Sequence, residues 1–239
     1  MKEIEKYDAH IQKLMNEIEE HTGDWSTLVQ CYNQMALLFQ YQGDMTNAID
    51  SFLAGIDMAE EHPDGISGGI YMNFSALCEE AGDYEKALFY RVKSFHMYER
   101  FPESEYRNDS LMAVASMTLR LYLKMQNLEA ARKEFELIRQ LQEKYGLISN
   151  GFEVYVNQLQ YISMIQDKEK EDEMLKKTLE SFWSCEELLE YTDECQELVS
   201  YLKKCEKYDL LEQVLDHISE KFKIDSEYTE NINDICLRV

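Results

Sequence analysis

Three groups of residues in this chain have side chains suited to chemistry: a serine between glycines, the histidines and the cysteines. The run Gly65-Ile66-Ser67-Gly68-Gly69 matches the G-x-S-x-G pattern of a nucleophile elbow, in which a strand leads into the serine and a helix leaves it. Here Pro63 and a helical pattern precede the serine, and no segment predicts a strand. We therefore interpret this run as a linker.

Patterns for metal and cofactor chemistry are also missing from the sequence. Di-metal helical bundles carry a glutamate three residues before a histidine, and none of the five histidines has an acidic residue there. The six cysteines form no C-x-x-C pair, and no G-x-x-x-x-G-K-[ST] loop for phosphate occurs. The sequence predicts no enzyme, no cofactor and no metal site. A helical enzyme or metal carrier is the remote alternative.

The elements that would position any remaining polar residues are helices joined by a recurring turn. The runs Gly43-Asp44-Met45-Thr46-Asn47-Ala48 and Gly82-Asp83-Tyr84-Glu85-Lys86-Ala87 share this turn, and Gln126-Asn127-Leu128-Glu129-Ala130-Ala131 is a weaker copy. The first residue ends a helix in the left-handed conformation, and the Asp or Asn caps the next helix. Because proline breaks helices and the chain contains only two prolines, we predict an almost wholly helical protein.

Small residues at the eighth, twentieth and twenty-seventh places of this unit, with aromatic residues near the fourth, eleventh and twenty-fourth, resemble the tetratricopeptide repeat. The resemblance implies an all-α fold, an α-α superhelix built as a right-handed solenoid of antiparallel helix pairs. Ala48 to Ala87 spans 39 residues and Ala87 to Ala131 spans 44, more than the usual ~34. Further along, Ala131, Glu171 and Leu211 occupy the twentieth place of successive units and are separated by two steps of 40 residues. This constant spacing indicates diverged repeats.

We predict a single repeat domain over residues 1–239. Its segments are an N-terminal capping helix at 1–22, repeats at 25–62, 68–101 and 109–145, diverged repeats at 150–183 and 185–222, and a terminal or truncated helix at 225–239. No partner helix follows the last segment, so it is either a short cap or the cut end of something longer.

In this register one series of helices faces the concave side of the array, and its polar residues form the candidate binding surface. Gln34, Asn73 and Asn157 occupy the same place of their repeats, and a ladder of amides can both donate to and accept from an extended peptide. Arg120 and Lys124, one turn apart, add a positive spot for a carboxylate. The alternative is that these are ordinary polar helix faces. The predicted binding residues are Gln30, Asn33, Gln34, Tyr41, Asn73, Arg120, Lys124, Asn157 and Gln160.

Charge narrows the class of partner. The net charge of -23 argues against nucleic acid and anionic membranes as partners. Between Lys86 and Lys144, however, 11 Lys and Arg stand against 8 Asp and Glu. One interpretation of the excess acid elsewhere is a set of solvated helix faces; the other is that the middle repeats carry the surface for an anionic partner. The N-terminus has no apolar run of a signal peptide, no stretch reaches the ~20 apolar residues of a membrane span, and unpaired cysteines suit a reducing compartment. The sequence predicts a cytoplasmic protein.

Tetratricopeptide arrays usually bind proteins or peptides, so the resemblance implies a non-catalytic scaffold with a protein or peptide partner; a homodimer is left open. The acidic, tyrosine-rich repeats also resemble the regulatory regions that precede GGDEF diguanylate cyclase domains in bacteria, which implies a sensor part of a signalling protein. One alternative is a peptide-pheromone receptor, although only about 24 residues precede the first repeat, too few for a DNA-binding or effector-binding bundle. A free-standing adaptor is the other alternative.

Overall fold

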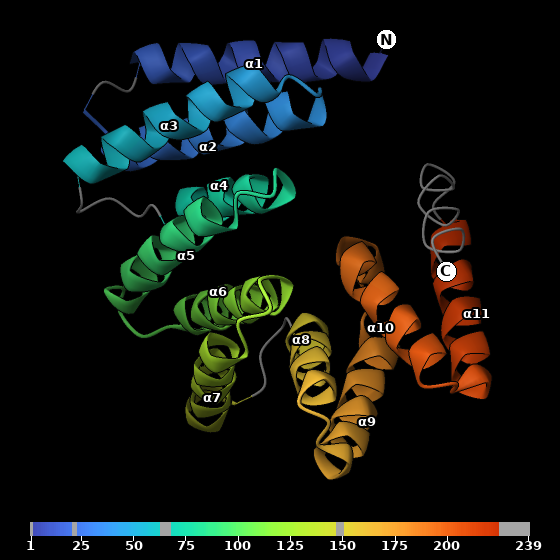
Figure 1. Ribbon diagram of the computed structural model, residues 1–239. Coiled ribbons are helices and arrows are strands. Elements are labelled where there is room, and N and C mark those ends of the chain that lie inside the picture. Colours follow the sequence, from blue (N-terminus) through green and yellow to red (C-terminus); the bar gives the residue numbers. More distant parts are fainter. Residues whose placement is uncertain (1, 21–22, 63–67, 147–150, 225–239) are drawn as a thin grey trace. The chain divides into compact units, whose positions relative to one another are not determined.

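The computed structural model describes residues 2–20, 23–62, 68–146 and 151–224, and the regular structure in these ranges is helical throughout (Figure 1). The predicted all-α fold is thereby confirmed. The chain divides into two compact units, Met1–Val114 and Ala115–Val239. The predicted terminal helix at 225–239 and the serine of the G-x-S-x-G run lie outside the described residues.

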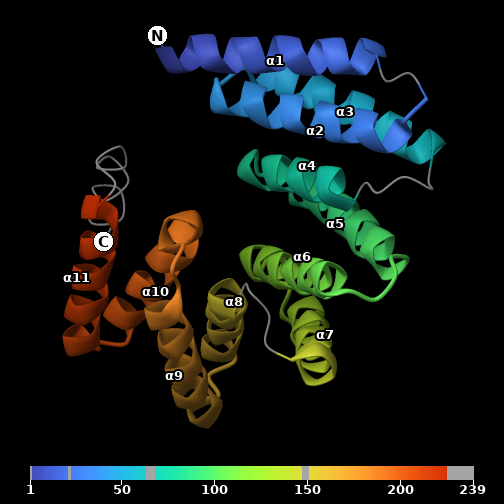
Figure 2. The same ribbon diagram turned by 180° about the vertical axis from the view of Figure 1, so that it is seen from behind.

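Short turns join most of the helices into consecutive pairs. In the first unit α2 packs against α3 and α4 against α5, while α1 covers α2 (Figures 1 and 2). In the second unit α8 pairs with α9 and α10 with α11, and α8 also packs against α7 and α10. The helices are α1 (Lys2–Glu20), α2 (Trp25–Tyr41), α3 (Met45–Glu61), α4 (Gly68–Glu80), α5 (Tyr84–Glu99), α6 (Glu105–Lys124), α7 (Leu128–Tyr145), α8 (Gly151–Met164), α9 (Lys168–Ser184), the 3₁₀ turn η1 (Leu188–Tyr191), α10 (Thr192–Lys204) and α11 (Tyr208–Ile224).

Five turns between helices share one backbone geometry. In each, the N–H of a left-handed residue donates to the carbonyl three residues back, and the next N–H donates to the carbonyl five residues back. These two bonds are the Schellman motif, which satisfies carbonyls that the end of a helix leaves unpaired. The turns predicted after Gly43, Gly82 and Gln126 are confirmed. The left-handed residues and their φ angles are Gly43 (76°), Gly82 (78°), Gln126 (55°), Gln166 (61°) and Glu206 (56°).

The residue after the left-handed one caps the next helix in four of these turns. Its side-chain oxygen accepts a hydrogen bond from the backbone N–H three residues on, the geometry that the sequence predicts for an Asp or Asn at this place. The last three left-handed residues are 40 residues apart. This is the same spacing that separates Ala131, Glu171 and Leu211 in the sequence. The caps are Asp44, Asp83, Asn127 and Asp167.

Small residues allow close helix packing in the first unit. Ala36 and Ala48 are completely buried where α2 meets α3. A Cβ atom at Gly55 of α3 would lie 2.8 Å from Cβ of Tyr32 in α2 and would also collide with Ile70 of α4. Since real Cβ contacts essentially never come this close, only glycine fits this position. The small places of the repeat motif therefore mark helix crossings.

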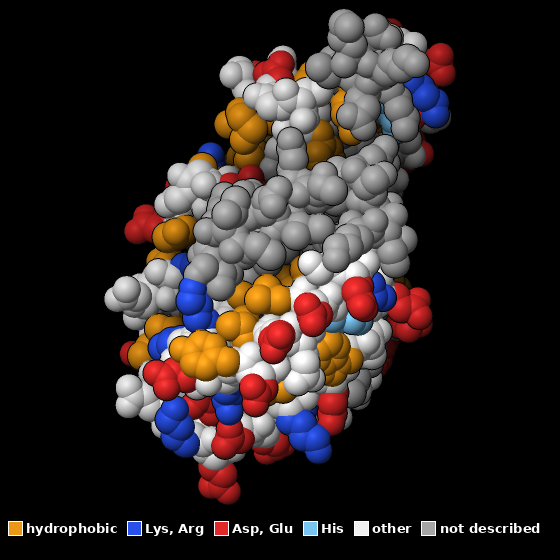
Figure 3. Space-filling view, turned by 90° about the vertical axis from the view of Figure 1, so that its right-hand side faces the viewer, with side chains coloured by type: hydrophobic (Ala, Val, Ile, Leu, Met, Phe, Trp, Pro, Cys, Tyr) orange, Lys and Arg blue, Asp and Glu red, His pale blue; other side chains and the backbone are white. Residues whose placement is uncertain are grey.

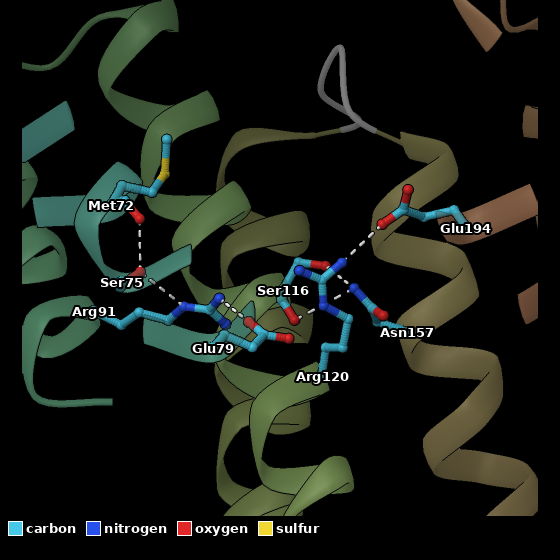
Figure 4. A network of polar contacts seen from close by, with 8 residues as sticks. All are labelled: Met72, Ser75, Glu79, Arg91, Ser116, Arg120, Asn157 and Glu194. Carbon is cyan, nitrogen blue, oxygen red and sulfur yellow. Dashed lines mark hydrogen bonds and ion pairs between the residues drawn. The ribbon is translucent and has the colours of Figure 1, made fainter. Parts of the chain in front are cut away.

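Arg91 interrupts the apolar pattern of α5, at the place where the first repeat has Phe52. Its side chain is completely buried and forms an ion pair with Glu79 of α4 (Figure 4). Its Nε also donates to Oγ of Ser75 over 3.2 Å, and that hydroxyl donates to the carbonyl of Met72. The first unit thus contains a buried polar network at a place where the first repeat has an apolar side chain.

The core of the second unit gathers the apolar faces of α8 to α11. Phe182 of α9 is completely buried, and its ring lies 5.4 Å from that of Phe152 in α8 and 5.3 Å from that of His217 in α11. The remaining buried members of this core are Val156, Leu159, Leu175, Leu188, Cys195, Leu198, Val199, Tyr201, Leu202, Val214 and Ile218.

The surface of the molecule carries charges of both signs. On the face shown in Figure 3, acidic side chains lie among basic and hydrophobic ones.

Glu134 of α7 makes the stability of the fold depend on pH. Burial raises the pKa of this carboxyl from 4.5 to about 7. Between these two values the folded chain keeps a proton that the unfolded chain has lost, so the contribution of Glu134 to stability falls as pH rises through this window. We expect Glu134→Gln to increase the free energy of unfolding by about 1–3 kcal/mol at about pH 8 and to change little at about pH 4.

Urea denaturation at the two pH values measures this difference. Glu136→Gln is the matched control, because Glu136 lies on the same helix with its carboxylate on the surface, where hydrogen bonds from Arg139 lower its pKa. The control should give no gain in stability at the higher pH. An equal effect of Glu134→Gln at both pH values would contradict the assignment.

Candidate peptide-binding groove

A hollow of about 290 Å³ lies between α6, α8 and α10 in the second unit. Three of the predicted binding residues, Arg120, Lys124 and Gln160, line it together. Its floor is apolar: Leu123 and Tyr201 are each 7% exposed, whereas Met164 at the edge is 40% exposed. The other lining residues are Ser163, Glu197, Ser200 and Lys204.

Two polar contacts connect the walls of this groove (Figure 4). Asn157 of α8 donates through Nδ2 to Oγ of Ser116 in α6 over 2.8 Å, and both side chains are buried. Arg120 of α6 pairs with Glu194 of α10, with 3.1 Å between Nη1 and Oε1. Because hydrogen bonds between buried groups have strict geometry, these contacts fix how α6, α8 and α10 face one another.

Charges of both signs line the groove. Beside the groove, burial raises the pKa of Glu194, and the charge of its partner Arg120 opposes that effect. Desolvation likewise raises the pKa of Glu197, against the positive charge of Lys124. Lys124 and Lys204 are exposed, so the groove presents two accessible ammonium groups beside one carboxylate that is easier to protonate than usual.

The other predicted residue of this unit, Asn157, has a different position from the one expected. Its side chain is only 1% exposed and its amide donates to Ser116, although it also lines an adjoining hollow of about 200 Å³. Such a buried amide offers a peptide little surface. Asn157 therefore positions α8 against α6 beneath the groove.

The remaining predicted residues lie in the first unit. Asn73 of α4 donates through Nδ2 to Oδ1 of Asn33 in α2 over 3.0 Å, and both side chains are half-buried. Gln30, Gln34 and Tyr41 of α2 are exposed, and Tyr41 stacks on Tyr7 of α1 with 6.5 Å between ring centroids. Of the three amides of the predicted ladder, Gln34 is exposed, Asn73 is engaged with Asn33 and Asn157 is engaged with Ser116.

Sequence reasoning missed the contribution of α10. The helix has no repeat motif, and its apolar residues predict only core positions. The step of 40 residues was the signal that could have located it: Arg120, Gln160 and Ser200 are equivalent places, and so are Lys124, Met164 and Lys204. These six residues all line the groove, which is therefore built from three copies of one helix face.

Residues 2–20, 23–62, 68–146 and 151–224 hold no cluster of three or more His, Cys, Asp or Glu side chains that could bind a metal ion. Within the same ranges no helix combines the length and apolar character that crossing a membrane requires. The groove itself contains an amide, hydroxyls, ammonium groups, a guanidinium, a carboxylate and apolar surface.

Comparison with solved structures identifies the fold. The chain is similar to the crystal structure of BtubC (BKLC) from P. vanneervenii, with a TM-score of 0.67 and 15% identity over 92% of this chain and 90% of that one. It is also similar to PilF of Pseudomonas aeruginosa, with a TM-score of 0.51 and 12% identity over 98% of each chain. No family model matches the sequence, and neither does any curated protein. Neither structural neighbour supports the resemblance to GGDEF proteins. The chain has the all-helical fold of tetratricopeptide-like repeat proteins.

Proposed function

We propose that this protein is a non-catalytic scaffold that binds an extended segment of a partner protein in the groove of α6, α8 and α10. The observation that carries the proposal is the threefold repetition of one helix face: equivalent residues of three helices line a single hollow. An extended peptide also repeats its backbone groups at regular intervals, so a surface with repeating polar positions matches it without demanding one sequence.

The lining residues suggest how such a segment would be held. Gln160 and Ser200 offer donors and acceptors for its backbone. Lys124 and Lys204 attract acidic side chains, whereas Met164 supplies flexible apolar contact at the edge. We therefore propose a segment that alternates acidic and apolar residues. Electrostatic attraction of this kind increases the association rate and the specificity more than the affinity.

The wider role that we propose is the regulatory or sensor part of a bacterial signalling protein, with a GGDEF diguanylate cyclase as the particular case suggested by the sequence resemblance. A peptide-pheromone sensor and a free-standing adaptor are the alternatives. The partner in each case is a protein or peptide and not nucleic acid or a membrane, and a second copy of the chain is one candidate. The free thiols of Cys31, Cys78, Cys185, Cys195 and Cys205 suit the proposed cytoplasmic location.

A charge-reversal series tests the groove. Peptides would be selected on the wild-type protein from a displayed random library, and their Kd values measured by fluorescence polarisation. We expect Lys124→Glu and Lys204→Glu each to weaken binding about tenfold, or about 1.4 kcal/mol. The matched control is Lys133→Glu on α7, whose side chain is 76% exposed and lies outside the groove. Peptides that bind both groove variants as tightly as the control would show that the groove is not their site.

A further inference from the structure

We propose that the second unit carries another binding site, distinct from the peptide groove, for a small uncharged molecule with a flat polar ring or amide. The site is a hollow of about 410 Å³ between α7, α8 and α9. This volume lies within the range of small-molecule sites in proteins, ~300–1,000 Å³. The residues that the argument uses are Phe135, Gln142, Tyr155, Gln158, Ile162 and Met174.

The central observation is the amide of Gln158 in α8. The side chain is only 2% exposed, and its Nε2 donates to Oε1 of Gln142 in α7 over 3.2 Å. Its own Oε1 is buried and has no hydrogen-bond partner among the described residues. Buried polar atoms in proteins almost always have a partner, and one without is unfavourable. Because Gln158 lines the hollow, a ligand there with an N–H or O–H group would be placed to donate to this oxygen.

The Gln158 and Gln142 amides together define the polar side of the ligand. Once Gln158 has donated to Gln142, the pair has an acceptor left on Gln158 and the amino group of Gln142 as a donor. A ligand that carries a donor next to an acceptor would satisfy both. Amides, lactams and the rings of nucleobases have this arrangement.

The walls of the hollow favour a flat molecule. Phe135 and Tyr155 supply aromatic surface, and the ring of Phe135 lies 4.8 Å from that of Tyr161, which holds it in place. Ile162 and Met174 add aliphatic surface. Aromatic side chains stack on flat rings in offset or edge-on geometry.

Charge favours an uncharged ligand over a strongly anionic one such as a phosphate ester. Three basic residues line the hollow, and each pairs with a neighbouring carboxylate. An anion would have to compete with these carboxylates, whereas an uncharged molecule leaves the pairs intact. The pairs are Arg139 with Glu136 and Glu143, Lys170 with Asp167, and Lys177 with Glu173.

The test uses the full chain with adenine, uracil, nicotinamide and benzamide as probes. Saturation-transfer NMR would detect binding, and chemical-shift titration would give the Kd. We expect at least one probe to bind and Gln158→Leu to weaken it tenfold or more. Gln140→Leu, an exposed glutamine of α7 outside the hollow, is the matched control and should leave the Kd unchanged.

A second variant guards against misfolding of Gln158→Leu. Met174→Trp fills the hollow from a half-buried position and should abolish probe binding. If none of the four probes binds the wild-type protein up to its solubility limit, the proposal is overturned. Binding that survives in both Gln158→Leu and Met174→Trp overturns it as well, because the probe then sits elsewhere.

Discussion

Glu79→Ala is expected to lower the free energy of unfolding by about 3–5 kcal/mol, because it leaves the guanidinium of Arg91 buried without its carboxylate. Arg91 is completely buried and Glu79 is 7% exposed, so solvent cannot replace the lost partner. The hydroxyl of Ser75, which accepts from Nε of Arg91, carries no charge and cannot replace the carboxylate. Urea denaturation followed by far-ultraviolet circular dichroism would measure the change.

The double variant Glu79→Met/Arg91→Met separates the value of the pair from the penalty of breaking it. Replacing a buried ion pair by apolar residues of similar volume is often neutral or stabilising. We therefore expect the free energy of unfolding of the double variant to be within about 1 kcal/mol of that of the wild type, or higher. If the single variant Glu79→Ala lowered the free energy of unfolding by less than about 1 kcal/mol, water would have to reach Arg91, and the network would then not be buried in solution.

Phe182→Ala is expected to reduce the free energy of unfolding by about 3–5 kcal/mol, because it opens a cavity at the centre of the core of the second unit. Phe182 is completely buried, and its ring contacts those of Phe152, Trp183 and His217. Chemical denaturation would measure the loss. Hydrogen exchange should show the largest increase in exchange rate at amides of α8 to α11.

Phe89→Ala is the matched control, since Phe89 is 54% exposed on α5. It should change the free energy of unfolding by less than about 1 kcal/mol. If the two variants lost the same stability, Phe182 would not be at the centre of the second core. If Phe182→Ala increased exchange equally along the whole chain, the two compact units would unfold as one.

Local chemistry explains why much of the fold is predictable. Gly43 and Gly82 favour the left-handed conformation that ends a helix, and Asp44 and Asp83 then cap the next helix. These preferences act within a few residues, so the sequence reveals them directly. The turn at Gln126 is recognisable only from the residues that follow it, Asn127 to Ala131, because a glutamine at a left-handed position leaves no signal of its own.

The candidate site was predictable only where a side chain stays on the surface. Arg120, Lys124 and Gln160 line the groove together as the register suggests. Asn157 belongs to the same register but lies beneath the surface, since Ser116 offers it a buried partner. Whether a polar residue at a helix crossing turns inward depends on the residue opposite, about 40 positions away, and no local pattern contains that information.

Arg91 is a second residue whose burial depends on contacts that no local sequence pattern reveals. Its sequence position predicts an apolar residue, and only the presence of Glu79 and Ser75 on the neighbouring helix makes its burial tolerable. The sequence shows this arginine as an irregularity in the repeat. The three-dimensional contacts show what compensates for it.

The five Schellman turns have a consequence for recognising such joints in a sequence. Each turn is held by backbone hydrogen bonds, and three of the five have Gln or Glu at the left-handed residue where glycine would be the ordinary choice. The backbone hydrogen bonds therefore fix the path of the chain without requiring glycine at the left-handed residue. A search of the sequence for glycine at this place would find two of these five turns and miss the other three.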